Sequence, residues 1–179
     1  MKKKIRVLVD TRQQAGKHEL THKILVGAGC ELISICLPYG DYMLWDGDYL
    51  PTKEDIEGRH LLAVDTKQGM QEIYNNLVGS HARFRRECEK ACGRLIVLDE
   101  GGDCDALENV HRWQNPRVSR YYQNKAYGRK VPKWPPVSSK RLQVMMETMR
   151  DKHGVRWEFC KPEESAGKIM QLLGIQEQD

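Results

Sequence analysis

A chain of 179 residues with 40% hydrophobic and 30% charged side chains has the size and composition of one compact globular domain. No apolar run approaches the roughly 18 residues that a membrane-spanning helix needs, and the basic start Met1-Lys2-Lys3-Lys4 is not followed by the long apolar stretch of a signal peptide. These features exclude a membrane-spanning class, and we expect a cytoplasmic protein with no membrane partner.

The first half of the chain alternates strand and helix signals. Runs rich in apolar and β-branched residues predict strands over residues 5–9, 31–37 and 42–45. A helix is predicted over residues 17–26, ended by Gly27-Ala28-Gly29. Asp46-Gly47 is a hairpin signal, so we expect residues 48–50 to return as a strand. The polar segment 51–59 is expected to be a loop.

The second half continues the alternation. Strands are predicted over residues 60–64, 95–98 and 155–159. Helices are predicted over residues 70–77 and 84–92, from Ser138 or Ser139 to about Lys152, and from Pro162 onward. Gly154 is expected to end the third of these helices. The alternation predicts an α/β fold, in which helices flank a mixed central sheet.

The six cysteines are even in number, but without a secretion signal we expect free thiols rather than disulfides. Cys88 and Cys92 are four residues apart in a helical pattern and would share a face. Neither a second pair nor a nearby histidine completes a zinc site, so no zinc is predicted.

Two carboxylates and an amine are placed where predicted strands meet their loops. Asp65 and Lys67 are two residues apart in an extended segment, so both side chains emerge on one face of the sheet. Thr66 points to the other face, although its backbone carbonyl can still reach a metal ion. Asp41 follows Gly40 at a kink between strands, which lets a neighbouring strand bring a second carboxylate close. Hard oxygen ligands hold Mg²⁺ or Mn²⁺, and a lysine can orient a water molecule or neutralise charge on a phosphate.

A basic segment over about residues 109–137 interrupts the alternation. No Asp or Glu occurs between Asn109 and Met146, and the segment and its flank hold these cations: Arg112, Arg117, Arg120, Lys125, Arg129, Lys130, Lys133, Lys140 and Arg141. Aromatic residues are interleaved with them: Trp113, Tyr121, Tyr122, Tyr127 and Trp134. Cations match phosphates and flat rings stack on unpaired bases, which favours nucleic acid. A solvated basic loop that meets an acidic protein partner is the alternative.

Several ordered motifs resemble one known family. Val9-Asp10-Thr11-Arg12-Gln13 is similar to the opening Val-Asp-x-Arg-Glu of the XPF-type (ERCC4-domain) nuclease domain, and Gly40-Asp41-Tyr42 to its Gly-Asp-Tyr element. Val64-Asp65-Thr66-Lys67 falls where the family has Val-Glu-Arg-Lys. Ile73–Leu77 with Arg83-Phe84, and the strand over 95–98 with Asp99-Glu100-Gly101, resemble the elements that follow. The resemblance covers residues 5–101 best.

The resemblance implies one restriction-endonuclease-like, PD-(D/E)xK-type nuclease domain over residues 1–179, with residues 109–137 as an insert. It implies catalysis by Asp41, Asp65 and Lys67, with Asp10 in support, and metal binding by Asp41, Asp65 and Thr66. Asp10 can equally initiate a turn. The sequence departs from the family where Asp65 replaces Glu and where Gln71, beside Glu72, replaces a supporting acid.

DNA is the partner that the resemblance and the basic segment imply together. The residues expected to contact it are Arg12, Arg83, Arg86, Arg117, Arg120, Arg129, Lys130 and Lys133. Arg12 can instead lock Asp10 in an ion pair, and Arg83 and Arg86 can belong to a solvated helix face.

The functional hypothesis is a magnesium- or manganese-dependent endonuclease that cuts branched, flapped or single-stranded DNA, with a homodimer left open. In overall style the chain resembles a stand-alone bacterial or phage nuclease, which implies a nucleoid-associated protein. Two alternatives stay open: a catalytically inactive DNA-binding module, indicated by Gln71, and a protein-interaction domain.

Overall fold

A six-stranded mixed sheet forms the centre of the computed structural model, which describes residues 4–13, 16 and 18–175. The strands are β1 (Ile5–Asp10), β2 (Cys30–Ile35), β3 (Tyr42–Trp45), β4 (Ala63–Lys67), β5 (Leu95–Asp99) and β6 (Arg156–Phe159). Their order is β2-β1-β3-β4-β5-β6, and β3 runs antiparallel to both of its neighbours while the other pairs are parallel. The predicted α/β fold with a mixed central sheet is confirmed.

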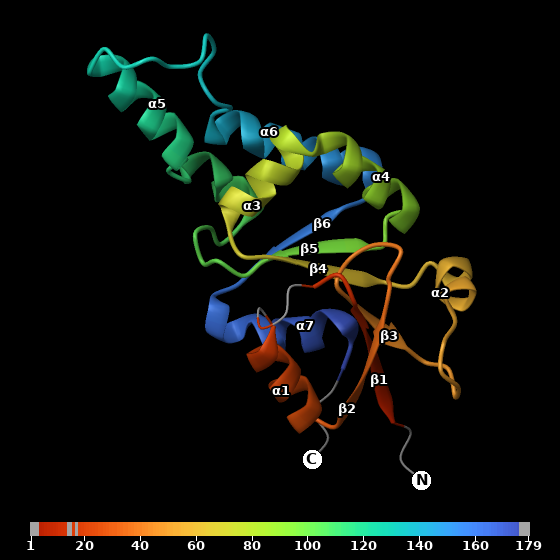
Figure 1. The fold of residues 1–179 in the computed structure, drawn as a ribbon. Coiled ribbons are helices and arrows are strands. Elements are labelled where there is room, and N and C mark those ends of the chain that lie inside the picture. Colours follow the sequence, from red (N-terminus) through yellow and green to blue (C-terminus); the bar gives the residue numbers. More distant parts are fainter. Residues whose placement is uncertain (1–3, 14–15, 17, 176–179) are drawn as a thin grey trace.

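Helices cover both faces of the sheet (Figure 1). One face carries α1 (Glu19–Gly27) and α7 (Ser165–Leu173), and the other carries α3 (Met70–Tyr74), α4 (His81–Ala91) and α6 (Ser139–His153). Gly154 ends α6 in the left-handed conformation with φ 67°, as predicted. The 3₁₀ turn η3 (Pro162–Glu164) leads into α7.

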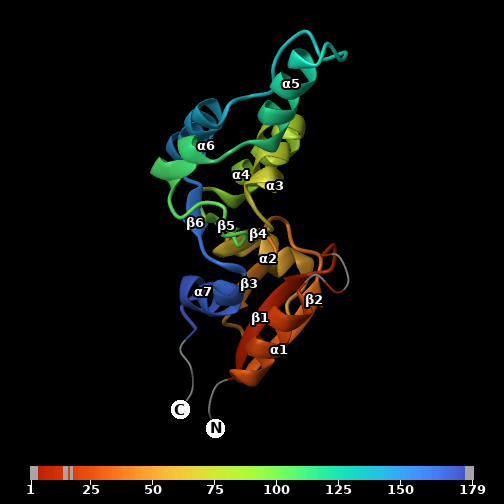
Figure 2. The ribbon, with the colours of Figure 1, turned by 90° about the vertical axis from the view of Figure 1, so that its left-hand side faces the viewer.

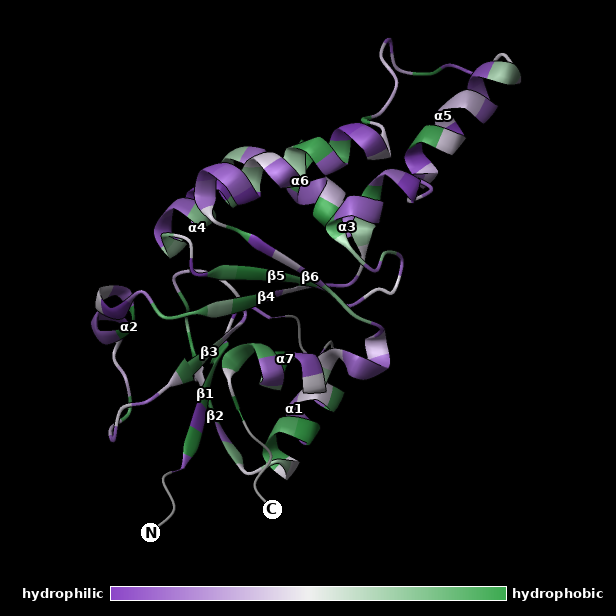
Figure 3. Cartoon of the chain, turned by 180° about the vertical axis from the view of Figure 1, so that it is seen from behind, coloured by the Kyte–Doolittle hydropathy of each residue, from purple (hydrophilic) through white to green (hydrophobic). Residues whose placement is uncertain are grey.

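The period-2 pattern of the strands divides the core into two clusters. Val7 and Val9 pack on the α1–α7 side, whereas Leu8 between them packs on the other side. Val64 and Ala63 divide in the same way. Figure 3 shows the strands, which are largely hydrophobic, between helices that contain both hydrophilic and hydrophobic residues. Because side chains alternate across a strand, one short sequence supplies both clusters.

The segment 51–59 is a helix, so its prediction as a loop is wrong. α2 runs over Lys53–Arg59, and Thr52 and Asp55 form a capping box in which each side chain accepts a hydrogen bond from the backbone N–H of the other residue. Ile56 is the buried residue of α2. With one apolar anchor, the helix depends on its cap more than on an amphipathic pattern.

The returning strand predicted at residues 48–50 is also wrong. The indole N–H of Trp45 donates to the carbonyl of Tyr49 at 2.8 Å, and Arg6 donates to the carbonyl of Gly47 at 2.7 Å. A Cβ atom at Gly47 would lie 2.6 Å from the Trp45 ring. The segment therefore folds over Trp45 instead of pairing with β3.

β4 begins later and ends later than predicted. It covers Ala63–Lys67, so Asp65 and Lys67 lie inside the strand and not beyond its end. The cause is β5, which pairs with β4 as far as Lys67↔Asp99.

The 3₁₀ helix η2 (Leu107–Arg112) leads into the basic segment, which contains the helix α5 (Pro116–Ala126). The Asn115 side chain caps α5 and Pro116 occupies its first turn. α5 projects beyond the sheet in both Figure 1 and Figure 2. No helix of the described part of the chain is long and apolar enough to cross a membrane.

Candidate active site

Asp41 is held between β1 and β4 by its backbone. Its N–H donates to the carbonyl of Val64 at 2.8 Å, and its own carbonyl accepts from the N–H of Asp10 at 3.0 Å. Gly40 permits this approach, because it has φ 66° and an added Cβ atom would lie 2.8 Å from the Cβ of Ala63. The kink predicted at Gly40-Asp41 therefore brings Asp41 against the strand that carries Asp65.

The carboxylate of Asp41 is anchored by Thr66. Its Oδ2 atom accepts the Thr66 backbone N–H at 2.8 Å and the Thr66 hydroxyl at 2.6 Å. The sequence suggested a role for the Thr66 backbone carbonyl alone, whereas its hydroxyl also takes part in the site. The remaining oxygen of Asp41 has no hydrogen-bond donor among the described residues.

Asp65 and Lys67 form a buried ion pair. The Lys67 Nζ atom lies 2.7 Å from Oδ1 and 2.6 Å from Oδ2 of Asp65. Lys67 is 9% exposed and Asp65 is 5% exposed. Burial raises the pKa of Asp65 to about 7, with Lys67 opposing the shift and Asp41 adding to it. Burial alone would lower the pKa of Lys67, but the charges of Asp65 and Asp41 outweigh it and raise that pKa. Lys67 is therefore an ammonium at neutral pH and serves as a donor and a positive charge, not as a base.

Asp10 is engaged by partners of its own. Its carboxylate accepts Arg12 Nε at 2.8 and 3.1 Å and the backbone N–H of Leu37 at 3.1 Å. Arg12 also donates to the Leu37 carbonyl at 2.6 Å. Asp10 and Arg12 thus connect the end of β1 to the segment after β2 by hydrogen bonds. Both residues also line a cavity.

Asp10, Asp41, Asp65, Thr66 and Lys67 line one cavity of about 720 Å³. The cations Arg12, Arg83, Arg86 and Lys90 also line it, together with Glu72 and Asn76. The structure thereby brings the predicted catalytic residues together with Arg12, Arg83 and Arg86 of the predicted DNA contacts.

Glu87 is a cavity residue that the sequence reasoning missed. It lies on α4, and its Oε1 atom accepts the N–H of Gly40 at 3.3 Å. Its charge also contributes to the raised pKa of Asp65. Helical spacing from Arg83 and Lys90 was the available signal, since residues three or four apart share a helix face.

A solved structure of XPF from Aeropyrum pernix aligns with 97% of this chain and 62% of its own length, with a TM-score of 0.55 and 18% sequence identity. The fold is similar to that of XPF. The chain spans less than two thirds of that XPF chain. No protein-family model matches the sequence, and no curated protein matches it either. The similarity in structure supports the resemblance found in the sequence motifs at the level of fold.

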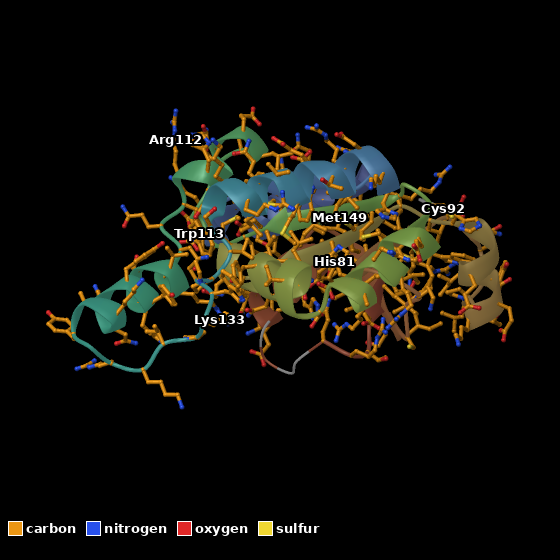
Figure 4. All side chains as sticks on the ribbon, turned by 90° about the horizontal axis from the view of Figure 1, so that it is seen from above. His81, Cys92, Arg112, Trp113, Lys133 and Met149 are labelled. Carbon is orange, nitrogen blue, oxygen red and sulfur yellow. The ribbon has the colours of Figure 1, made fainter. Side chains whose placement is uncertain are left out.

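The other predicted DNA contacts of this XPF-like fold lie apart from the cavity. Arg117, Arg120 and Lys130 line a second hollow, also of about 720 Å³. Arg129 lies over the Tyr127 ring at 5.6 Å, and Lys133 lies 5.3 Å from the Trp134 ring centroid. Figure 4 shows Lys133 on the connection between α5 and α6, away from His81 at the start of α4. The predicted contacts thus form two groups.

The donor chemistry of the cavity fits a hard divalent cation. Among residues 4–13, 16 and 18–175, no three His, Cys, Asp or Glu side chains are grouped to hold a metal by themselves. Mg²⁺ commonly takes one or two carboxylates and completes its shell with water and phosphate oxygens. Asp41 and Asp65 can provide that share, provided that the Lys67 ammonium moves off Asp65.

Proposed function

We propose that the chain is a divalent-metal-dependent nuclease that hydrolyses DNA phosphodiester bonds. The main support for the proposal is the cavity. Asp41 and Asp65 line it from two separate segments of the chain, and Lys67 is in contact with Asp65. The XPF-like fold supports the same assignment. In this proposal residues 1–179 act as one nuclease domain with residues 109–137 as an insert.

Asp41, Asp65 and the Thr66 carbonyl would hold Mg²⁺ or Mn²⁺, which supplies Lewis acidity toward the phosphate and lowers the pKa of a bound water. Lys67 orients the attacking water and offsets the negative charge that grows on the phosphate. The water oxygen bonds to phosphorus and gives up a proton to solvent, the bond to the leaving oxygen breaks, and that oxygen takes up a proton from solvent. Arg83 and Arg86, which line the cavity, bind neighbouring phosphates.

A cleavage assay tests the proposal. Purified protein with magnesium is incubated with end-labelled forked, duplex and single-stranded DNA, beside Asp65→Asn, Lys67→Ala and the control Asp46→Asn. Asp46 pairs with Arg59 on the surface and does not line the cavity, so it matches the change in charge without touching the site. We expect cleavage by wild type and Asp46→Asn only. Equal inertness of all four proteins on every DNA rejects the proposal.

A catalytically inactive DNA-binding module is the second candidate, and the Asp65–Lys67 pair favours it. Both Asp65 oxygens lie within 2.7 Å of Lys67 Nζ. The ammonium group therefore already occupies the position in which a metal ion would bind the Asp65 carboxylate. This candidate predicts salt-sensitive DNA binding with no cleavage in magnesium or manganese.

A further inference from the structure

The second hollow is lined by residues of α3, of α5 and of the connection from α5 to α6. We call it the arm groove and define it by Tyr74, Arg117, Arg120, Lys130 and Trp134, which line it together with neighbouring residues. No Asp or Glu is among the described residues that line it. A concave surface of this size with cations and without acids fits an anionic ligand.

The cations of the arm groove are not neutralised by the protein. Arg120 and Lys130 make neither an ion pair nor a hydrogen bond within the described part of the chain. Arg117 donates to the side-chain amide of Asn75 at 2.9 Å and lies 5.4 Å from the Tyr74 ring centroid, and both of these partners are uncharged. Three positive charges are therefore available to phosphates.

Trp134 adds a stacking surface to these charges. Its side chain is 73% exposed although it lines the groove, so a large flat ring faces solvent. Unpaired bases stack on such rings with little sequence preference, whereas a duplex keeps its bases stacked inside. The combination of an exposed ring with unpaired cations distinguishes a single strand from other polyanions.

Helix α3 is a shared wall of the groove and the cavity. Gln71 and Tyr74 line the arm groove, whereas the neighbouring Glu72 lines the cavity. The π-helical turn η1 (Asn75–Gly79) repeats this division, because Asn75 binds Arg117 and Asn76 lines the cavity. A strand that leaves the cavity therefore has only α3 and this turn to cross before it reaches the groove.

We propose that the arm groove binds an unpaired DNA strand, with a base stacked on Trp134 and phosphates on Arg117, Arg120 and Lys130. The cavity then holds the junction from which that strand emerges. The position of the junction rests on the proposed nuclease function. Strand binding in the groove does not, because it needs no metal and no cleavage.

Binding of fluorescein-labelled oligothymidylate in EDTA tests the proposal without any contribution from cleavage. Wild type is compared with Trp134→Ala and with Tyr127→Ala. The Tyr127 ring is 77% exposed in the same basic segment but does not line the groove. We expect wild type to bind with an affinity that falls steeply with salt, Trp134→Ala to bind about tenfold more weakly, and Tyr127→Ala to stay within about twofold.

Tryptophan emission gives a second readout. Of the four tryptophans, Trp45 is buried and Trp113 and Trp157 are half-buried, so base stacking should quench Trp134 selectively. Trp134→Phe is expected to remove the quenching while it retains most of the affinity, because phenylalanine still offers a ring.

Three results overturn the inference: equal loss in Trp134→Ala and Tyr127→Ala, competition by duplex DNA as strong as by single-stranded DNA, or equally tight binding of polyglutamate. The outcomes also separate the two proposals. Groove binding without cleavage of any forked DNA rejects the nuclease and keeps the groove. Cleavage with unchanged strand binding in Trp134→Ala does the reverse.

Discussion

The cavity and the arm groove have similar volumes and both are lined by charged side chains. They differ in whether acidic and basic side chains form ion pairs with each other. In the cavity, Asp65 is paired with Lys67 and Asp10 with Arg12. In the groove, Arg120 and Lys130 have no such partners in the described residues. A buried ion pair such as Asp65–Lys67 fixes geometry for chemistry, whereas unpaired exposed cations attract a polyanion from a distance. We therefore expect the cleavage rate and the affinity for a DNA strand to respond to different substitutions.

The largest effect is expected from Asp65→Asn. Loss of a negatively charged ligand should lower the cleavage rate by about 100-fold or more, while oligothymidylate affinity in EDTA stays within about twofold. Rates on forked DNA and fluorescence anisotropy measure the two quantities. A parallel fall of cleavage and strand affinity would show that the cavity and the groove are not separable.

Lys67→Met tests the contribution of the buried ion pair to the free energy of unfolding. It leaves the buried Asp65 carboxylate without its partner, which should reduce the free energy of unfolding by about 3–5 kcal/mol. Lys53→Met removes the exposed pair with Glu57 and should cost below about 1 kcal/mol. Urea unfolding measures both. The double variant Asp65→Asn/Lys67→Met should recover most of the loss, and failure to recover it would mean that the pair is not the source.

Asp99→Asn tests a buried acid outside the proposed chemistry. Burial raises the pKa of Asp99 from 3.8 to about 6, and its Oδ2 atom has no hydrogen-bond partner among the residues that the structure describes. The contribution of Asp99 to the stability of wild type is therefore fully present below pH 3.8 and is lost as the pH rises through about 6. At pH 7.5 the variant should be more stable than wild type by up to about 3 kcal/mol, and at pH 4 it should have no advantage. Urea unfolding at both pH values checks the sign, and an identical difference at both would contradict it.

Thr66→Val is expected to have the smallest effect. It removes the hydroxyl that donates to Asp41 at 2.6 Å but keeps the backbone N–H at 2.8 Å, so the cost should be about 1 kcal/mol. Thr66→Ser retains the hydroxyl and is the control. If valine and serine behave alike in unfolding, the hydroxyl does not anchor Asp41.

The six strands of the sheet, and the meeting of Asp41, Asp65 and Lys67 at one cavity, could be predicted because their signals are local. The alternation in Val7-Leu8-Val9, the Gly40-Asp41 kink and the Asp65-x-Lys67 spacing each determine a face or a turn without help from distant residues. The stop of α6 at Gly154 is of the same kind.

The errors arose where tertiary contacts decide the structure. Asp46-Gly47 is a hairpin signal, but the loop packs on Trp45 and turns away from β3. The helix α2 buries only Ile56, so its sequence shows little amphipathic pattern. Helical spacing could have placed Glu87 on the same face as Arg83 and Lys90, but its contact with Gly40 forms only when α4 packs on the sheet.

The most direct measurement is Mn²⁺ binding to the protein without DNA, followed by electron paramagnetic resonance of the free ion. Wild type and Asp46→Asn should bind the ion, whereas Asp41→Asn and Asp65→Asn should each bind it at least about tenfold more weakly, since each removes a ligand of a single site. Equal affinity in all four proteins would show that the two carboxylates do not share a cation.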